Sequence, residues 1–114
     1  MDKKRAPMKN MPIGKILDQI VARIINTANP RKIILFGSAV RGEMGPDSDL
    51  DLLVVVATGQ HRRKTAQKIY RNLVGIGFAA DIVVVTEDDI EKFKDHVGMI
   101  IQPALKNGRL LYAA

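Results

Sequence analysis

Apolar residues in the first third of the chain recur at the spacing of one helix face. Between residues 13 and 25, isoleucine, leucine and valine fall three or four positions apart, which predicts an amphipathic helix that ends near Asn26. Asn29 and Pro30 then interrupt the pattern, since proline cannot continue a helix. The apolar run Lys32–Phe36 has the length and composition of a short buried strand. A helix followed by a strand is therefore expected first.

Two further strands are predicted on either side of a basic helix. The run Leu50–Val56 is apolar except for Asp51, which is typical of a strand in the centre of a sheet. Residues 61–74 place apolar side chains among basic ones at helical spacing, and the glycines at 75 and 77 end that helix. Residues 81–85 read Asp-Ile-Val-Val-Val and predict a third strand.

Shorter signals complete the predicted order. Ser38 is placed to cap a short helix that runs towards Gly42. Thr86, with Asp89 three residues later, forms a capping box before a helix around residues 90–93. Residues 96–106 are predicted as a last helix and residues 109–112 as a terminal strand. The order αβαβαβαβ predicts an α/β fold, with a small mixed sheet of about four strands and helices packed against it. The pattern leaves the direction of each strand open.

Length and composition limit the chain to one small domain. With 114 residues there is room for one hydrophobic core and not for two. Residues 1–12 contain four basic residues and two prolines without any periodicity, so we expect a flexible basic tail there and a single domain over residues 13–114. Because aromatic residues make up only 4% of the chain, this core must be mainly aliphatic.

Cysteine content, apolar runs and charge narrow the function classes. The absence of cysteine excludes disulfides, zinc fingers and thiol catalysis, and it fits a reducing cytoplasm. No apolar run approaches the roughly 20 residues of a membrane-spanning helix, and no apolar signal core follows the basic N-terminus. We therefore expect a cytoplasmic protein without membrane association. The net charge of +6 favours a nucleotide, a nucleic acid or an acidic protein as partner, although a solvated charged face explains it equally well.

Three aspartates mark the candidate chemistry. Asp49 and Asp51 lie two positions apart at the start of a strand, so alternation places both carboxylates on one face. Unpaired acids at the start of an apolar strand are costly to bury, and a divalent cation such as Mg²⁺ or Mn²⁺ would offset that cost. Asp81 opens the next apolar strand in the same way, and neighbouring strands would bring it beside the pair. It would then bind metal or accept a proton; a strand-end cap or a salt bridge is the alternative.

A glycine and a serine between a strand and a helix mark a candidate phosphate site. Backbone N–H groups at such a place favour phosphate oxygens. Gly37 would let the backbone approach the phosphates without a Cβ clash, and Ser38 would donate its hydroxyl. Arg41, one turn further, would either reach the triphosphate or pair with Asp47 or Glu43.

Taken together, these residues resemble the minimal nucleotidyltransferases of the DNA polymerase beta superfamily. The shared pattern is Gly-Ser, then Arg-Gly, then Ser-Asp-x-Asp leading into an apolar strand, and a third Asp before a later strand. The resemblance is strongest over residues 33–56 and extends from about residue 13 to residue 112. It implies the polymerase beta-like nucleotidyltransferase fold. The pattern is filled here by Gly37-Ser38, Arg41-Gly42, Ser48-Asp49-Leu50-Asp51 and Asp81.

The resemblance also implies a role for each motif residue. Asp49 and Asp51 would bind two Mg²⁺ ions, and Asp81 would be the third acidic ligand and the base. Mn²⁺ would be an alternative metal. The substrate would be ATP or another nucleoside triphosphate. Its binding residues would be Gly37, Ser38, Arg41 and Ser48.

The resemblance further implies a protein partner. Minimal members of the family are often encoded beside a helical HEPN-domain protein, in pairs that look like toxin–antitoxin systems. The transferase would move AMP from ATP to a hydroxyl of the HEPN toxin and so act as its antitoxin. Two alternatives stay open: a non-catalytic module that neutralises a partner by contact, and a transferase acting on a small molecule or an RNA end. The basic residues within 62–71 would serve RNA, but no aromatic residues are interleaved with them, so nucleic acid is not favoured. The sequence leaves the oligomeric state open.

Overall fold

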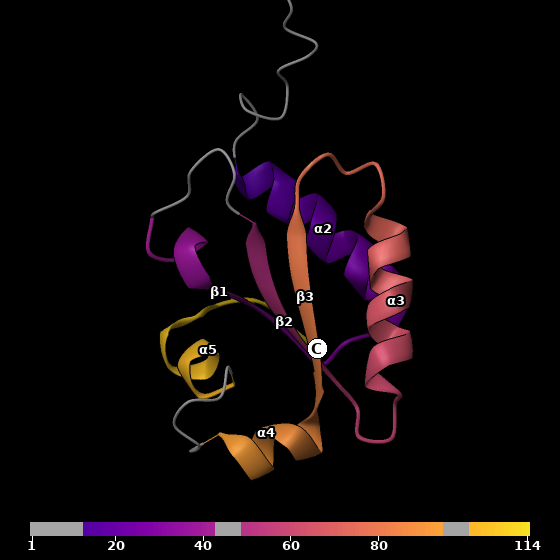
Figure 1. Cartoon of the computed structure of the whole chain (residues 1–114), viewed down its shortest axis with the longest axis vertical. Helices are drawn as coiled ribbons and strands as arrows, with labels where there is room; N and C mark the ends of the chain where they lie inside the picture. The colour runs from indigo at the N-terminus through magenta and orange to yellow at the C-terminus, as the bar shows by residue number, and fades with distance from the viewer. Residues whose placement is uncertain (1–12, 43–48, 95–100) are drawn as a thin grey trace, which may run out of the picture.

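The computed structural model describes residues 13–42, 49–94 and 101–114. The tail predicted at residues 1–12 lies outside them. None of the helices in the described ranges is long and apolar enough to cross a membrane. Figure 1 shows the elements, which in chain order are α2 (Ile13–Ala28), β1 (Lys32–Phe36), the 3₁₀ turn η1 (Gly37–Ala39), β2 (Leu50–Val56), α3 (Arg62–Leu73), β3 (Ala80–Thr86), α4 (Glu87–Phe93), α5 (Ile101–Asn107) and β4 (Arg109–Ala113).

The strands form one mixed sheet in the order β3-β2-β1-β4. Strand β1 is antiparallel to both β2 and β4, whereas β2 and β3 are parallel. The parallel pair is joined by α3, because two parallel strands need a crossover connection rather than a hairpin. The predicted α/β fold with a four-stranded mixed sheet is confirmed, and so is the central position of the strand over residues 50–56.

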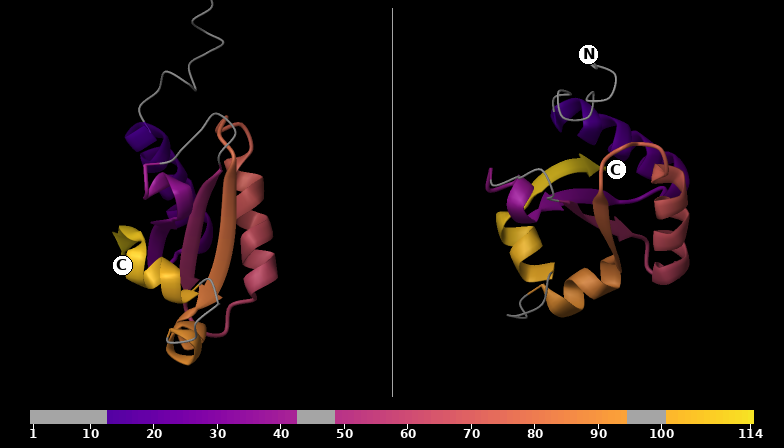
Figure 2. Two further views of the ribbon diagram at one scale, coloured as in Figure 1. Left: turned by 60° about the vertical axis from the view of Figure 1, so that its left-hand side comes forward. Right: turned by 45° about the horizontal axis from the view of Figure 1, so that its top comes forward.

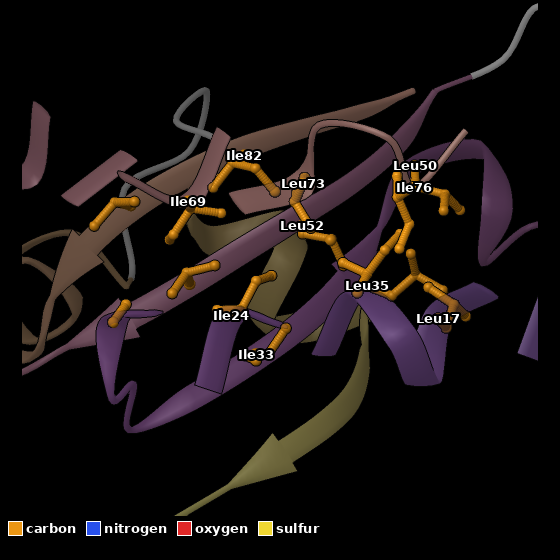
Figure 3. Packing of buried hydrophobic residues seen from close by; sticks show 14 of the residues in the cluster. Leu17, Ile24, Ile33, Leu35, Leu50, Leu52, Ile69, Leu73, Ile76 and Ile82 are labelled. Carbon is orange, nitrogen blue, oxygen red and sulfur yellow. The ribbon is translucent and has the colours of Figure 1, made fainter. Parts of the chain in front are cut away.

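One face of the sheet carries the larger hydrophobic core. Helices α2 and α3 lie side by side on this face (Figure 2). The apolar stripe of α2 is used here: Ile16, Ile20 and Ile24 are each at most 1% exposed, as are Leu52 of β2 and Ile69 of α3. Figure 3 shows side chains of this core meeting between helices and strands. The amphipathic helix is therefore packed against the protein's own sheet.

The opposite face is covered by α4 and α5, which pack on a smaller cluster that includes Leu53, Val55 and Val85. Since side chains alternate along a strand, Asp51 and Asp81 belong to this same face. Helix α4 lies at the end where β3 finishes (Figure 1), away from the first residues of β2 and β3. Asp51 is accordingly half-buried and Asp81 exposed. This end of the face is where a ligand could approach the two acids.

Most predicted helix boundaries are close to those observed, and the capping box at Thr86 is present with both of its hydrogen bonds. Helix α2 runs to Ala28, two residues beyond the predicted end, and Asn29 ends it with a φ of 49°. The pattern predicts the last helix from residue 96; α5 begins at Ile101 in the described part of the chain, and residues 95–100 lie outside it.

The predicted cap at Ser38 is wrong. Residues 37–39 form a 3₁₀ turn whose N-cap position is Phe36, without a side-chain hydrogen bond. Gly37 has a φ of +80°, in the left-handed region, so the chain turns sharply after β1 instead of entering an α-helix. Ser38 lies inside this turn. A three-residue turn has little helix dipole, so the predicted electrostatic attraction of phosphate to a helix start is not supported.

Candidate active site

Two of the three predicted acids lie directly opposite each other on neighbouring strands. Asp51 of β2 and Asp81 of β3 are partners in the parallel register, so both side chains leave the same face of the sheet. Asp49 lies two residues before Asp51 and is exposed. The Leu50 N–H donates to the Ala79 carbonyl at 3.0 Å, which carries the strand pairing on towards Asp49. We call Asp49, Asp51 and Asp81 the acidic cluster.

The charges of the acidic cluster act on one another. Burial raises the pKa of Asp51 above its ordinary value of 3.8, and the negative charges of Asp81 and Asp49 raise it further. The positive charge of Arg41 acts in the opposite direction but does not cancel the increase. Burial is thus the main cause of the raised pKa, and the negative charges of Asp81 and Asp49 add to it; a bound cation would offset those charges.

The chemistry of the acidic cluster fits a hard divalent cation, because Mg²⁺ and Mn²⁺ prefer carboxylate oxygens. Among the described residues, however, no three histidine, cysteine, aspartate or glutamate side chains lie close enough to hold one metal ion. Like-charged carboxylates repel one another, and Asp81 is held by a tyrosine described below. The residue types of the acidic cluster therefore suit a divalent cation, but the three carboxylates do not lie close enough together to hold one ion.

Gly37 connects the turn after β1 to the acidic cluster. Phe36 is the register partner of Asp51 on the other side of β2, so Phe36, Asp51 and Asp81 form one row across three strands. A Cβ on Gly37 would collide with the Asp51 carboxylate oxygen Oδ2. The close approach and the positive φ both require glycine here. The predicted phosphate-binding residue thus lies against a predicted metal ligand.

The other predicted nucleotide-binding residues have different outcomes. Ser38 is half-buried within η1, and Arg41 is exposed but close enough to influence the Asp51 pKa. Ser48 lies outside the described residues. The alternative pairing of Arg41 with Asp47 or Glu43 concerns residues outside the described ranges as well.

A hollow of about 410 Å³ adjoins the turn. Its volume is within the usual range for small-molecule sites, about 300–1,000 Å³. Helix α5 forms part of its wall, although no motif in the sequence pointed to that helix. The α5 residues could not be recognised from the sequence, because they reach the hollow only through the packing of α5 against β1. The lining residues are Phe36, Gly37, Val40, Arg41, Pro103 and Asn107.

Tyr70 of α3 is a further site residue that the sequence did not reveal. Its hydroxyl donates to Asp81 Oδ1 at 3.2 Å and accepts the Ile82 N–H at 2.8 Å. Burial raises the pKa of Tyr70; the Ile82 N–H opposes that rise, and the negative charges of Asp81 and Asp49 add to it. Within residues 61–74 the helical pattern distinguishes only apolar from basic positions, and it counts Tyr70 among the apolar ones. The one signal in the sequence was the polar hydroxyl of Tyr70, which follows the buried Ile69 and so lies at the border of the apolar face of α3.

The fold is shared with a solved protein. A "putative nucleotidyltransferase" from Sulfolobus solfataricus superimposes with a TM-score of 0.60 over 87% of this chain and 78% of that chain, at 20% sequence identity. At that identity the likeness concerns the fold alone. No curated protein sequence matches the chain.

The sequence profile of the nucleotidyltransferase domain family matches residues 15–111. That match covers most of the chain, so the protein belongs to the nucleotidyltransferase domain family. Members of this family transfer a nucleotidyl group, which implies a nucleoside triphosphate as substrate.

Proposed function

We propose that the chain is an active, magnesium-dependent nucleotidyltransferase that moves AMP from ATP to an acceptor hydroxyl. The observation that carries the proposal is the row formed by Asp51 and Asp81 on adjacent parallel strands, with Gly37 in contact with Asp51. This arrangement supports a site in which the turn after β1 would bind phosphate beside carboxylates at one end of the sheet. The proposed reaction requires both parts in one place.

Each residue has a distinct part in the proposed reaction. Bound at the acidic cluster, two Mg²⁺ ions, or Mn²⁺ in their place, would supply the charge that stabilises the attacking and leaving oxygens of an in-line displacement. Asp51 of β2 and Asp49 just before that strand would hold the metal, and Asp81 would complete the ligand set and accept the proton of the acceptor hydroxyl.

The triphosphate would lie along the turn after β1. The backbone at Gly37 permits close approach, the Ser38 hydroxyl would donate to a phosphate oxygen, and the Arg41 guanidinium would add positive charge. Ser48 completes the motif by its position in the sequence. The hollow beside Gly37 and Arg41 has the size to accept the nucleoside part of the same ligand.

We further propose a HEPN-domain toxin as the acceptor, with this chain as a cytoplasmic antitoxin. This part of the proposal rests on the resemblance of the motifs to the minimal nucleotidyltransferases. The identity of the neighbouring gene is the simplest check. A gene for an unrelated enzyme at that position would remove the support for a toxin–antitoxin role while leaving nucleotidyl transfer unaffected.

The experiment uses ATP labelled at the α-phosphate, Mg²⁺ and the candidate partner, with wild type, Asp49→Asn and the control Asp18→Asn. Asp18 is an exposed residue of α2, remote from the acidic cluster in the chain. We expect the partner to be labelled by wild type and Asp18→Asn, and labelling to fall by more than about 100-fold with Asp49→Asn, in line with the loss of an electrostatic contact in the transition state. Equal labelling by all three proteins would contradict the enzymatic proposal. Neutralisation of the partner by mixtures without ATP would favour a module that acts by contact.

A second candidate acceptor is the end of an RNA. The observation that favours it is the composition of α3, which has five basic residues, no acidic residue and a position beside Asp81. Contacts with phosphates would make the affinity fall steeply with salt, by a slope of about 0.7 per neutralised phosphate on a single strand. Binding to a single-stranded RNA that does not change between low and moderate salt would exclude this acceptor. The basic residues are Arg62, Arg63, Lys64, Lys68 and Arg71.

A further inference from the structure

The order of groups across the sheet fixes the side from which an acceptor approaches. The turn at Gly37 follows β1, Asp51 of β2 comes next, and Asp81 lies on β3, which is an edge strand. In an in-line displacement, the acceptor oxygen and the leaving pyrophosphate lie on opposite sides of the α-phosphorus. If the pyrophosphate lies at the Gly37 turn, as in the proposed function, the acceptor hydroxyl comes from the β3 edge.

The Tyr70 hydroxyl already lies at that edge. It is 3.2 Å from Asp81 Oδ1, within the distance of about 2.6–3.2 Å at which a general base takes a proton. The Ile82 N–H, on the free side of β3, donates to the same oxygen at 2.8 Å and holds it in position. Tyr70 as a whole residue is 42% exposed, so its side chain is not enclosed in the core.

We infer that Tyr70 is a nucleotidylation site and that the chain transfers a nucleotide to its own Tyr70. The inference rests on the proposed function. The Tyr70 oxygen attacks the α-phosphorus of a nucleoside triphosphate, its proton goes to Asp81, and the bond to the β-phosphate oxygen breaks. The products are a phosphodiester on Tyr70 and free pyrophosphate, so atoms and charge balance without any oxidant or reductant.

The geometry gives the self-transfer two recognisable properties. Tyr70 and Asp81 belong to one chain, so the reaction is intramolecular and its rate constant does not depend on protein concentration. The nucleotide added to Tyr70 then occupies the acceptor side of Asp81. The reaction therefore stops at one nucleotide per chain, and the modified protein transfers more slowly to any other acceptor.

The test is to incubate the protein with ATP and Mg²⁺ and measure its intact mass, then to locate the modification by peptide mass spectrometry. The chain contains two tyrosines, so Tyr112 of β4 serves as an internal control. We expect one adenylyl group per chain, located on Tyr70 and absent from Tyr112, with the same rate constant over a tenfold range of protein concentration. Protein purified from cells should already carry part of this modification before any ATP is added. Tyr70→Phe should remain unmodified.

Other outcomes separate this inference from the proposed function. If wild type labels a partner while Tyr70 stays unmodified, self-transfer is wrong and nucleotidyl transfer stands. If, in addition, Tyr70→Phe slows that transfer, Tyr70 only positions Asp81. If ATP neither reacts nor binds in a Mg²⁺-dependent way, the proposed function itself fails. Should Tyr70→Phe fold poorly, the peptide map of wild type still decides, since it needs no variant.

Discussion

Replacing Gly37 with alanine tests the contact between the turn after β1, the proposed phosphate site, and the acidic cluster. The new Cβ faces two obstacles. The residue has a φ of +80°, which is unfavourable for any side chain, and the Cβ would collide with Asp51 Oδ2. Gly75 provides a matched control because its φ is +87° and no described atom lies within 4 Å of the place that a Cβ would take there. The difference between the two variants therefore isolates the collision with Asp51.

The magnitudes follow from these two terms. A left-handed conformation costs a non-glycine residue about 1–2 kcal/mol, so Gly75→Ala should lose that amount of unfolding free energy. Gly37→Ala should lose a further 1–3 kcal/mol or so, the typical cost of forcing an extra group into an occupied space. For a domain of this size, about 1 kcal/mol corresponds to roughly 4–8 °C in Tm.

The assay is thermal and urea unfolding of the single variants Gly37→Ala, Gly75→Ala and Asp51→Ala and of the double variant Gly37→Ala/Asp51→Ala. Removing the Asp51 carboxylate should restore most of the extra loss, leaving the double variant close to the sum of the Asp51→Ala effect and the strain term. If the proposed roles are right, nucleotidyl transfer by Gly37→Ala should fall by more than about tenfold, since the methyl group would displace the proposed metal ligand Asp51 and fill the proposed phosphate site. If Gly37→Ala and Gly75→Ala are equally destabilising, and Asp51→Ala brings no relief, the turn does not touch the acidic cluster.

Two further predictions concern pH. The pKa of Asp51 is raised in the folded protein, so ionisation of Asp51 opposes folding as pH rises above 3.8. Asp51→Asn should therefore raise Tm at pH 7 without metal. It should give no such gain near pH 3, where the carboxyl group is protonated in both states. Circular dichroism melts at both pH values check this, and a lower Tm at pH 7 would contradict it. Burial alone would raise the pKa of Asp89, but the Thr86 N–H and Arg62 together lower it below 3.8. The stability that the Asp89 carboxylate supplies is present above pH 3.8 and is lost as pH falls through the lowered pKa. Arg62→Ala should therefore reduce the unfolding free energy by up to about 1 kcal/mol at pH 7 and by progressively less in acid. A pH-independent cost would show that the Arg62–Asp89 pair, 3.0 Å apart, is not the cause.

The elements that the sequence predicted correctly are those whose signals are local. The helical repeat in α2, the apolar runs of β1 and β2, and the Thr86 capping box each lie within a few residues, so the pattern alone defines them. The strand order was not accessible in this way. Strand β4 pairs with β1, more than 70 residues earlier in the chain, and neither strand carries a mark of its partner.

The candidate site shows the same division. Alternation correctly placed Asp51 and Asp81 on a common face, because it depends only on the period of a strand. The conformation at Ser38 was missed because the φ of Gly37 redirects the chain after β1. The contact of Tyr70 with Asp81 depends on how α3 is rotated over the edge of the sheet, and that rotation is set by the packing of Ile69 and Leu73 in the core.

The most direct test of the account is Mg²⁺-dependent binding of a non-hydrolysable ATP analogue, measured by isothermal titration calorimetry. Wild type and the control Asp18→Asn should bind the analogue only when Mg²⁺ is present. Asp49→Asn, Asp51→Asn and Asp81→Asn should each bind it at least about tenfold more weakly, a difference of roughly 1.4 kcal/mol. Binding that is equally tight in all five proteins, or unchanged by removal of Mg²⁺, would contradict the claim that the acidic cluster and the Gly37 turn form one metal–nucleotide site.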